Sequence, residues 1–154
     1  MPFVFQILIA ESPSATMRRL LEARSVPGRG LEGDRYYSGS GTFSPTPQKP
    51  DFEITLIEKE KIEAFAHETG LAFTAAQARR NVVTEGVDLN ALVGKKFLIG
   101  SVCIRGIRLC EPCTYLAKTS FPETLKGLIH RAGLRAQILS EGFIREGDSI
   151  SLIP

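Results

Sequence analysis

The sequence has 154 residues, the size of one ordinary domain, and we expect a single domain over residues 1–154. Hydrophobic residues make up 43% of it and charged residues 23%, a balance that excludes disordered, collagen-like and coiled-coil proteins. The 19 basic and 17 acidic residues leave a net charge of +2, so charge predicts neither a nucleic-acid nor a membrane partner. The three cysteines are an odd number, unlike the paired cysteines of small secreted proteins, and predict a cytoplasmic protein with reduced thiols.

The N-terminal third begins with an apolar run, residues 3–10, that is rich in β-branched and aromatic side chains and predicts a buried strand. It lacks the features of a signal peptide and is too short to span a bilayer, which takes ~20 residues. Residues 17–24 fit either a second strand or a helical turn. Residues 25–50 hold five of the 14 glycines and four of the nine prolines, and predict a long loop anchored by apolar side chains, namely Leu31, Tyr36, Tyr37 and Phe43.

The remaining elements alternate between short helices and short strands. Apolar spacing and capping residues predict helices over 58–69, 74–79, 88–93 and 122–131. Short β segments are expected at 53–56, 81–84, 95–99, 102–109, 134–139 and 149–153. Strands and helices do not alternate as βαβ units do, so we expect a mainly β, α+β fold. Its most probable form on this pattern is a closed or half-open, mostly antiparallel β-barrel with short helices.

The glycine-rich segment at residues 28–33 matches the pattern GxGxxG. A dinucleotide-binding fingerprint requires a strand directly before these glycines and a helix opening within them, and neither context is predicted here. A weaker function remains, because glycines let backbone amides approach an anion and Arg29 and Arg35 are suited to pair with one. Equally, Arg35 has a local carboxylate, Asp34, with which to pair.

Cys110 and Cys113 form a CxxC motif, CEPC, for which three interpretations compete. Zinc is disfavoured, because Cys103, His67 and His130 are the only further thiol or imidazole ligands and none lies at zinc-finger spacing. A thioredoxin-like dithiol would need a βαβ context and a helix start, whereas residues 114–117 show no clear helical pattern. The third interpretation is one working thiol beside an incidental cysteine. Of the flanking Arg105 and Arg108, only one can face that thiol, since they have opposite strand parity. Cys103 is expected to be a buried core thiol.

Arg79, Arg80 and Asn81 lie at a predicted junction between a helix and a strand. Arginine and asparagine suit phosphate and the amide-like edge of a heterocycle, but the residues alone favour a solvated turn.

Four segments together resemble the MOSC domain, which occurs at the C-terminus of molybdenum cofactor sulfurases, in amidoxime-reducing proteins and in small stand-alone bacterial proteins. They are GLEGDRYYSGSGTFS (30–44), RRNVVTEGVDLNALVGKKFLIG (79–100), RLCEPCTYL (108–116) and GLRAQILSEGFIREGDSI (133–150). The resemblance implies a β-barrel-like domain with one functional cysteine, matching Cys113, which precedes Thr114. That cysteine would bind the molybdenum of a pterin cofactor or carry sulfur as a persulfide.

The resemblance also implies a cofactor-binding set. Arg79 and Asn81 match an Arg-x-Asn pattern of amidoxime-reducing relatives, and Gly33, Asp34 and Arg35 belong to the glycine-rich loop that would hold the anionic pterin. Thr114, next to Cys113, completes the expected cofactor-binding set. Such a protein would be a molybdenum-dependent oxidoreductase or a sulfur transferase. The alternative is a metal-free sulfur carrier between a cysteine desulfurase and a molybdoenzyme, or a binding module with an idle cysteine. Family members are often associated with pyridoxal phosphate, but this chain has no domain to bind it. Cys110 would be a resolving thiol or a bystander.

Overall fold

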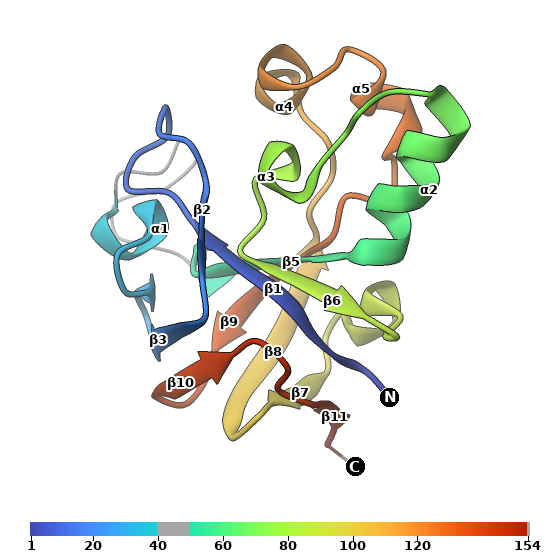
Figure 1. Ribbon diagram of the computed structural model, residues 1–154. Helices are drawn as coiled ribbons and strands as arrows, with labels where there is room; N and C mark the ends of the chain where they lie inside the picture. Colours follow the sequence, from blue (N-terminus) through green and yellow to red (C-terminus); the bar gives the residue numbers. More distant parts are fainter. Residues whose placement is uncertain (40–49, 154) are drawn as a thin grey trace.

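The computed structural model describes residues 1–39 and 50–153 (Figure 1). Its strands are β1 (Phe3–Ile9), β2 (Arg18–Leu20), β3 (Glu22–Val26), β4 (Gly30–Leu31), β5 (Ile54–Glu58), β6 (Val82–Glu85), β7 (Lys96–Ile99), β8 (Val102–Leu109), β9 (Leu134–Ile138), β10 (Gly142–Arg145) and β11 (Ile150–Leu152). Its helices are α1 (Arg35–Ser38), α2 (Lys59–Thr69), α3 (Ala75–Ala78), α4 (Thr114–Thr119) and α5 (Thr124–Gly127), with 3₁₀ turns η1 (Pro50–Phe52) and η2 (Leu89–Leu92).

The main sheet has eight strands in the order β11-β7-β8-β9-β5-β6-β1-β2, and it curls on itself. Backbone hydrogen bonds join the start of β1 to the segment before β11. The Val4 N–H donates to the Asp148 carbonyl at 2.8 Å, and the Ile150 N–H donates to the Pro2 carbonyl at 3.0 Å. These bonds close seven strands into a barrel, with β2 extending beyond the closure. A mainly β, barrel-like fold with short helices is therefore confirmed.

A second sheet, β10-β3-β4, packs at one end of the barrel. Strands β2 and β3 are separated only by Leu21, so one bent segment passes from the large sheet into the small one. Residues 17–24, which fitted a strand or a helical turn, are thus mainly strand. β10 was not predicted, because its four residues carry a single buried side chain, Ile144, and give no clear alternation.

One crossover departs from the antiparallel pattern. β5 and β6 pair in parallel, connected through α2 and α3, while every other pair of the strands described is antiparallel. The expectation that the chain contains no βαβ arrangement is therefore wrong at this one place. Outside these strand pairs, Val93 and Gly106 form an isolated parallel bridge. All five residues of β5 are buried, because the barrel interior covers one face and the helices cover the other.

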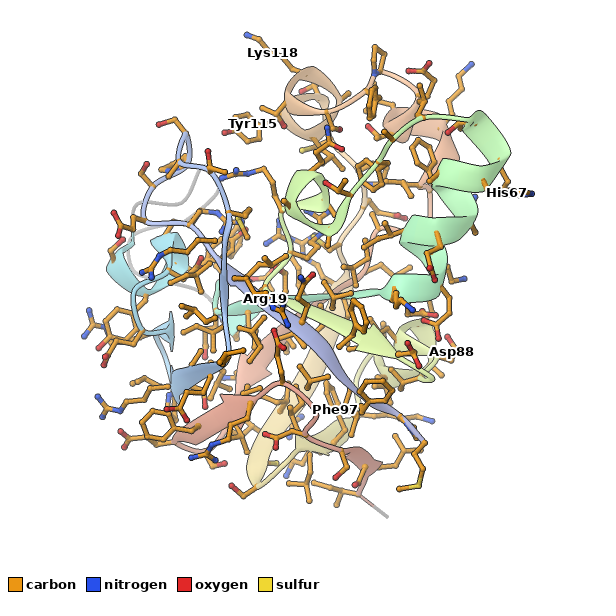
Figure 2. The ribbon with its side chains drawn as sticks, in the orientation of Figure 1. Arg19, His67, Asp88, Phe97, Tyr115 and Lys118 are labelled. Carbon is orange, nitrogen blue, oxygen red and sulfur yellow. The ribbon has the colours of Figure 1, made fainter. Side chains whose placement is uncertain are left out.

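The structure has two apolar clusters, one on each face of the main sheet. The barrel interior holds residues such as Ile7, Leu56, Phe97 and Ile104. The outer cluster lies between the sheet and the helices, where Phe65 and Phe73 meet edge to face with ring centres 5.1 Å apart. Figure 2 shows Phe97 within the barrel, far from Tyr115 and Lys118 on α4. None of the described helices is long and apolar enough to cross a membrane.

Most local predictions in the second half of the chain agree with the structure to within two residues. α3 has the expected Thr74 cap, which forms a reciprocal capping box with Gln77. The helix expected over 122–131 is wrong, because α5 covers only Thr124–Gly127. Gly127 lies against the Phe65 ring, and His130 adopts a positive φ of 59°, which ends helical geometry.

The glycine-rich segment folds around a buried carboxylate. Glu53 is 2% exposed, and its Oε1 accepts hydrogen bonds from the Gly28 N–H at 3.0 Å and the Ile138 N–H at 3.1 Å. Gly30 lies so close to the Glu53 carbonyl that a side chain would displace it. The segment expected to be one long loop contains β4 and α1, and buries Leu31 and Tyr36 as expected. Phe43 lies outside the described residues.

Glu53 should make stability depend on pH. Burial raises the pKa of Glu53, and the two backbone N–H groups only partly offset this. A carboxyl whose pKa is higher in the folded than in the unfolded state destabilises the folded protein once it ionises. We expect the unfolding free energy of Glu53→Gln, relative to wild type, to increase as pH rises from 4 to 7. Urea unfolding at these pH values tests this, and a relative stability that falls with pH would contradict it.

Gly133 should be the least replaceable glycine, because it has a φ of 110° and an added Cβ would collide with the Leu56 carbonyl oxygen. Gly147 is the matched control, with a φ of 88° and open space around it. Gly147→Ala should lower the unfolding free energy by about 1–2 kcal/mol from backbone strain alone. Gly133→Ala should lower the unfolding free energy by about 1–3 kcal/mol more than Gly147→Ala does, because of the collision. Equal costs in urea unfolding would contradict the close approach.

Candidate functional site

A pocket of about 260 Å³ lies beside the C-terminal end of β8, between that strand, α1, the α3–β6 junction and α4. The side chains around it are mostly basic or aromatic, and both CEPC cysteines are among them. The lining residues are Arg35, Tyr36, Phe52, Arg79, Arg80, Arg108, Cys110, Glu111, Cys113, Tyr115, Leu116 and Arg135.

The two cysteines differ in environment. Cys113 is partly exposed, lies directly before the first residue of α4, and packs against the edge of the outer apolar cluster. Cys110 is only 2% exposed, and its N–H donates to the Gly133 carbonyl at 2.8 Å where β8 ends. Cys103 lines no part of the pocket. The expectation that Cys103 is a core thiol is wrong, because Val102 and Ile104 point into the barrel and turn it toward the half-exposed outer face.

The residues of the CEPC segment, 110–113, form no helix, strand, turn or bend, and the helix begins only at Thr114. The absence of helix expected at residues 114–117 is wrong, since they form α4. Both cysteines are free thiols. Glu111 ties this segment to His130, because its Oε1 accepts from the His130 N–H at 2.7 Å and its Oε2 lies 2.6 Å from His130 Nδ1.

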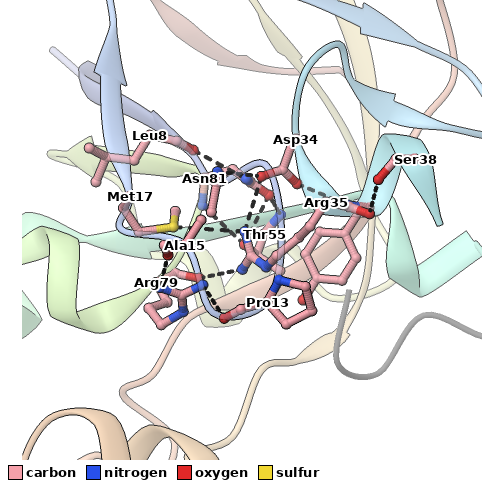
Figure 3. A network of polar contacts seen from close by, with 12 residues as sticks. Leu8, Pro13, Ala15, Met17, Asp34, Arg35, Ser38, Thr55, Arg79 and Asn81 are labelled. Carbon is pink, nitrogen blue, oxygen red and sulfur yellow. Dashed lines mark hydrogen bonds and ion pairs between the residues drawn. The ribbon is translucent and has the colours of Figure 1, made fainter. Parts of the chain in front are cut away.

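Asp34 builds the first wall of the pocket. Its Oδ1 accepts from the Ala10 N–H and from Arg35 Nη1, both at 3.0 Å, and its Oδ2 caps α1 through the Tyr36 N–H at 3.2 Å. Arg35 is buried, and its Nη2 donates to the Arg79 carbonyl at 3.0 Å (Figure 3). A buried carboxylate thus fixes a buried guanidinium, and that guanidinium fixes the backbone of the next arginine.

Arg79 ends α3 in the left-handed conformation, with φ 56°. Its guanidinium donates to the Ala15 and Pro13 carbonyls, each at 2.8 Å, and the Tyr115 hydroxyl donates to the same Pro13 carbonyl. Burial and the nearby Arg35 lower the pKa of Arg79. A guanidinium remains charged at neutral pH even so, and Arg79 therefore stays cationic beside another cation.

Arg80, Arg108 and Arg135 come from the opposite wall. Arg80 is buried and donates to the Ala132, Ala78 and Cys110 carbonyls at 2.8, 3.1 and 3.4 Å. The guanidinium of Arg135 lies 5.0 Å from the centre of the Phe52 ring. Burial acts to lower the pKa of Arg135, but the acidic groups of Cys110, Tyr36 and Asp51 outweigh it and raise that pKa. Arg108 is exposed and pairs with Asp51 at 2.6 Å.

The pocket has an excess of positive charge. Five arginines and one glutamate line it. Arg35 pairs with Asp34 and Arg108 with Asp51, but Arg79, Arg80 and Arg135 have no carboxylate within salt-bridge distance among the described residues. Buried guanidinium groups are usually paired with anions, so this arrangement favours an anionic ligand next to the thiol of Cys113.

The comparisons with known proteins identify the family. The family model described as the MOSC domain matches residues 41–151. The chain belongs to the MOSC domain family. No curated protein matches it in sequence.

Solved structures share the MOSC fold of this chain at low sequence identity. The YuaD protein from Bacillus subtilis superposes with a TM-score of 0.77 at 16% identity, covering 97% of this chain and 94% of that one. YiiM from Geobacillus stearothermophilus gives a TM-score of 0.77 at 15% identity, covering 100% and 76%. YiiM from Escherichia coli gives 0.70 at 17% identity, covering 97% and 69%.

The structure brings together only part of the residue set that the MOSC resemblance implied. Cys113, Arg79 and Arg35 line the pocket, with Asp34 directly behind Arg35. Asn81 does not line it. This residue is fully buried, its Oδ1 accepts from the Thr55 N–H and hydroxyl, and its Nδ2 donates to the Leu8 carbonyl (Figure 3).

Gly33 and Thr114 are exposed and also lie outside the pocket lining. Gly33 has a φ of 88° and packs near the Ile9 side chain. Of the segment 28–35 only Arg35 lines the pocket. The Gly28 N–H donates to Glu53, and Gly30 lies against the Glu53 carbonyl.

Several lining residues were not singled out from the sequence. Arg108 lines the pocket and Arg105 does not, so only one of the two faces it, as expected. The parity argument behind that expectation is wrong, because a bulge between Gly106 and Arg108 places both arginines on the same face of the sheet. Arg135 follows buried Leu134 in β9 and pairs across the ladder with Arg108. The position of Arg135 in the pocket follows from the register between β8 and β9, and the local sequence does not predict it. Tyr36 was expected only as a buried anchor of the glycine- and proline-rich segment, and Phe52, which lies just beyond that segment, was not singled out.

Asp34 should be essential for the first wall, because Asp34→Ala leaves a buried arginine and a buried N–H without their acceptor. We expect this variant to lower the unfolding free energy by about 3–5 kcal/mol. Glu11→Ala is the control, since Glu11 and Arg18 form an exposed pair at 3.8 Å that should contribute less than about 1 kcal/mol. Urea unfolding measures both. A loss for Asp34→Ala no larger than that for Glu11→Ala would show that Arg35 does not depend on Asp34.

Proposed function

We propose that this MOSC protein binds the anionic, metal-bearing end of a molybdenum–pterin cofactor, with Cys113 as the thiolate next to the metal. The observation that carries the proposal is the arginine-rich pocket beside a partly exposed thiol. Molybdenum accepts soft sulfur ligands, and a cysteine thiolate is the softest donor that proteins offer. When bound, the cofactor would supply two-electron redox or sulfur-transfer chemistry.

The chain's own residues would have distinct roles. Arg79 and Arg35 would bind anionic oxygens of the ligand on the α1 and α3 side, and Arg80 and Arg135 would do so on the β9 side. Guanidinium groups suit this task, because they donate in a planar fork that matches phosphate and other oxyanions. Asn81 would act as a positioning residue, since its buried amide fixes the backbone from which Arg79 and Arg80 extend.

The alternative is a sulfur carrier or adaptor that docks to a cysteine desulfurase and a molybdoenzyme without binding metal. An exposed thiol is sufficient for such a carrier. A pocket with three arginines lacking carboxylate partners is not needed for it, and two of them, Arg80 and Arg135, are buried, where an unpaired charge costs stability. The pocket therefore supports the cofactor-binding protein over the simple carrier.

The proposal predicts metal and pterin together in the purified protein. Expressed with an intact cofactor supply, wild type should contain near-stoichiometric molybdenum by elemental analysis and pterin by fluorescence after oxidation. Cys113→Ala should lower the molybdenum content by more than roughly tenfold, because the metal loses its protein ligand. Arg79→Gln should lower the pterin content as well, since the anionic end loses a charged donor.

Cys103→Ala is the matched control, because Cys103 lies on β8 outside the pocket and should leave both contents unchanged. Intact mass of each sample is recorded in parallel. Wild type without molybdenum, carrying one additional sulfur atom on Cys113, would favour the carrier. Equal metal content in wild type and Cys113→Ala would contradict the proposed role of this thiol.

A further inference from the structure

We infer that the same pocket takes a small sulfur oxyanion with a sulfane sulfur, of the thiosulfate class, as a direct sulfur donor to Cys113, without a metal or a partner enzyme. This inference deepens the proposed function and rests on it in placing Cys113 as the working thiol of the arginine pocket. It adds a substrate class and a reaction to that site.

The first argument is the combination of a nucleophile with an anion site. The reactive form of cysteine is the thiolate, which repels an anionic substrate in open solution. A pocket whose lining holds five arginines and one glutamate offsets this repulsion and retains the negative charge of the substrate and the leaving group. The substrate that such a site suits best carries its electrophilic atom on an oxyanion.

The second argument is size. Pockets for drug-sized ligands have volumes of about 300–1,000 Å³. The volume here is about 260 Å³, and Arg79, Arg80 and Arg135 converge on it without carboxylate partners among the described residues. High charge in a small volume fits a compact oxyanion better than a large neutral molecule. Phe52 and Leu116 supply an apolar part of the wall, which suits the less hydrated sulfane sulfur.

The transfer step balances without an oxidant. The Cys113 thiolate attacks the sulfane sulfur of thiosulfate, a new S–S bond forms, and the old S–S bond breaks with its electron pair leaving on sulfite. The products are a Cys113 persulfide and sulfite. A nucleophilic acceptor, cyanide in the assay below, then takes the outer sulfur as thiocyanate and regenerates the Cys113 thiolate.

The burial of Cys110 bears on which acceptor completes the cycle. Attack by Cys110 would release hydrosulfide and leave a disulfide, but Cys110 is only 2% exposed and its N–H is bonded to the Gly133 carbonyl where β8 ends. The His130–Glu111 contacts fix the segment between them. The persulfide on Cys113 is therefore available to an external acceptor, and Cys110 serves as a buried wall residue.

The experiment uses the full chain, purified from cells that cannot make the pterin cofactor, reduced, and incubated with thiosulfate. We expect a mass increase of one sulfur atom that maps to Cys113 and is removed by a thiol reductant. With thiosulfate and cyanide together, wild type should form thiocyanate catalytically. Cys113→Ser should abolish both signals, and Cys103→Ser should leave both unchanged.

The arginine dependence provides a second, independent readout. Arg135→Gln removes a pocket charge that has no carboxylate partner among the described residues, and it should raise the KM for thiosulfate roughly tenfold while changing kcat much less, because a charge-assisted contact to the bound oxyanion is lost. Arg105→Gln is the control on the neighbouring strand β8, outside the pocket lining, and should leave the KM unchanged.

Three outcomes would overturn the inference: no sulfur on Cys113, equal labelling of Cys103, or thiocyanate formation that persists in Cys113→Ser. Failure here is separable from failure of the proposed function. If molybdenum and pterin still depend on Cys113, only the sulfur donor has been misassigned. If neither thiosulfate nor cofactor depends on Cys113, the working role of that thiol is wrong.

Discussion

The buried amide of Asn81 is the contact on which the site depends. It lies at the point where β1, β5 and β6 come together, accepting from Thr55 and donating to Leu8. A fully buried amide must have its hydrogen-bonding groups paired, so these bonds allow very little freedom in the relative position of the three strands. Arg79 and Arg80 directly precede Asn81, so the fixed position of Asn81 also fixes the backbone of these two arginines.

The electrostatics of the pocket follow from this fixed backbone. Arg80 extends back toward β9 and β8 and donates only to backbone carbonyls, and Arg79 holds the 13–15 loop in the same way. Carbonyl groups satisfy the donors of a guanidinium but do not neutralise its charge. The hydrogen-bonding requirement and the charge requirement are therefore met by different partners. The hydrogen-bonding requirement is fulfilled within the chain, and under the proposed function an anionic ligand would fulfil the charge requirement.

The limits of sequence-based prediction here have a physical explanation. Strands such as β8 were predicted because alternation along one segment reports burial directly, and α2 was predicted by its apolar face and Gly70. α4 and the shortness of α5 depend on contacts with distant segments, such as Gly127 against Phe65. The site divides in the same way. Cys113 and Arg79 belong to recognisable local motifs, whereas Arg135 reaches the pocket only through the register of β9 against β8.

The role of Asn81 shows why a motif can match a family while its residues do different work. The Arg-x-Asn pattern suggests two ligand-binding side chains. Arg79, however, has the left-handed conformation, and the chain turns sharply there before it reaches Asn81. The side chains on either side of that turn face different environments, a pocket in one case and the junction of three strands in the other. If the pocket binds the proposed ligand, a substitution at either position would disturb binding, at Arg79 by removing a donor and at Asn81 by releasing the strands that position that donor. Only measurements that separate affinity from stability distinguish the two.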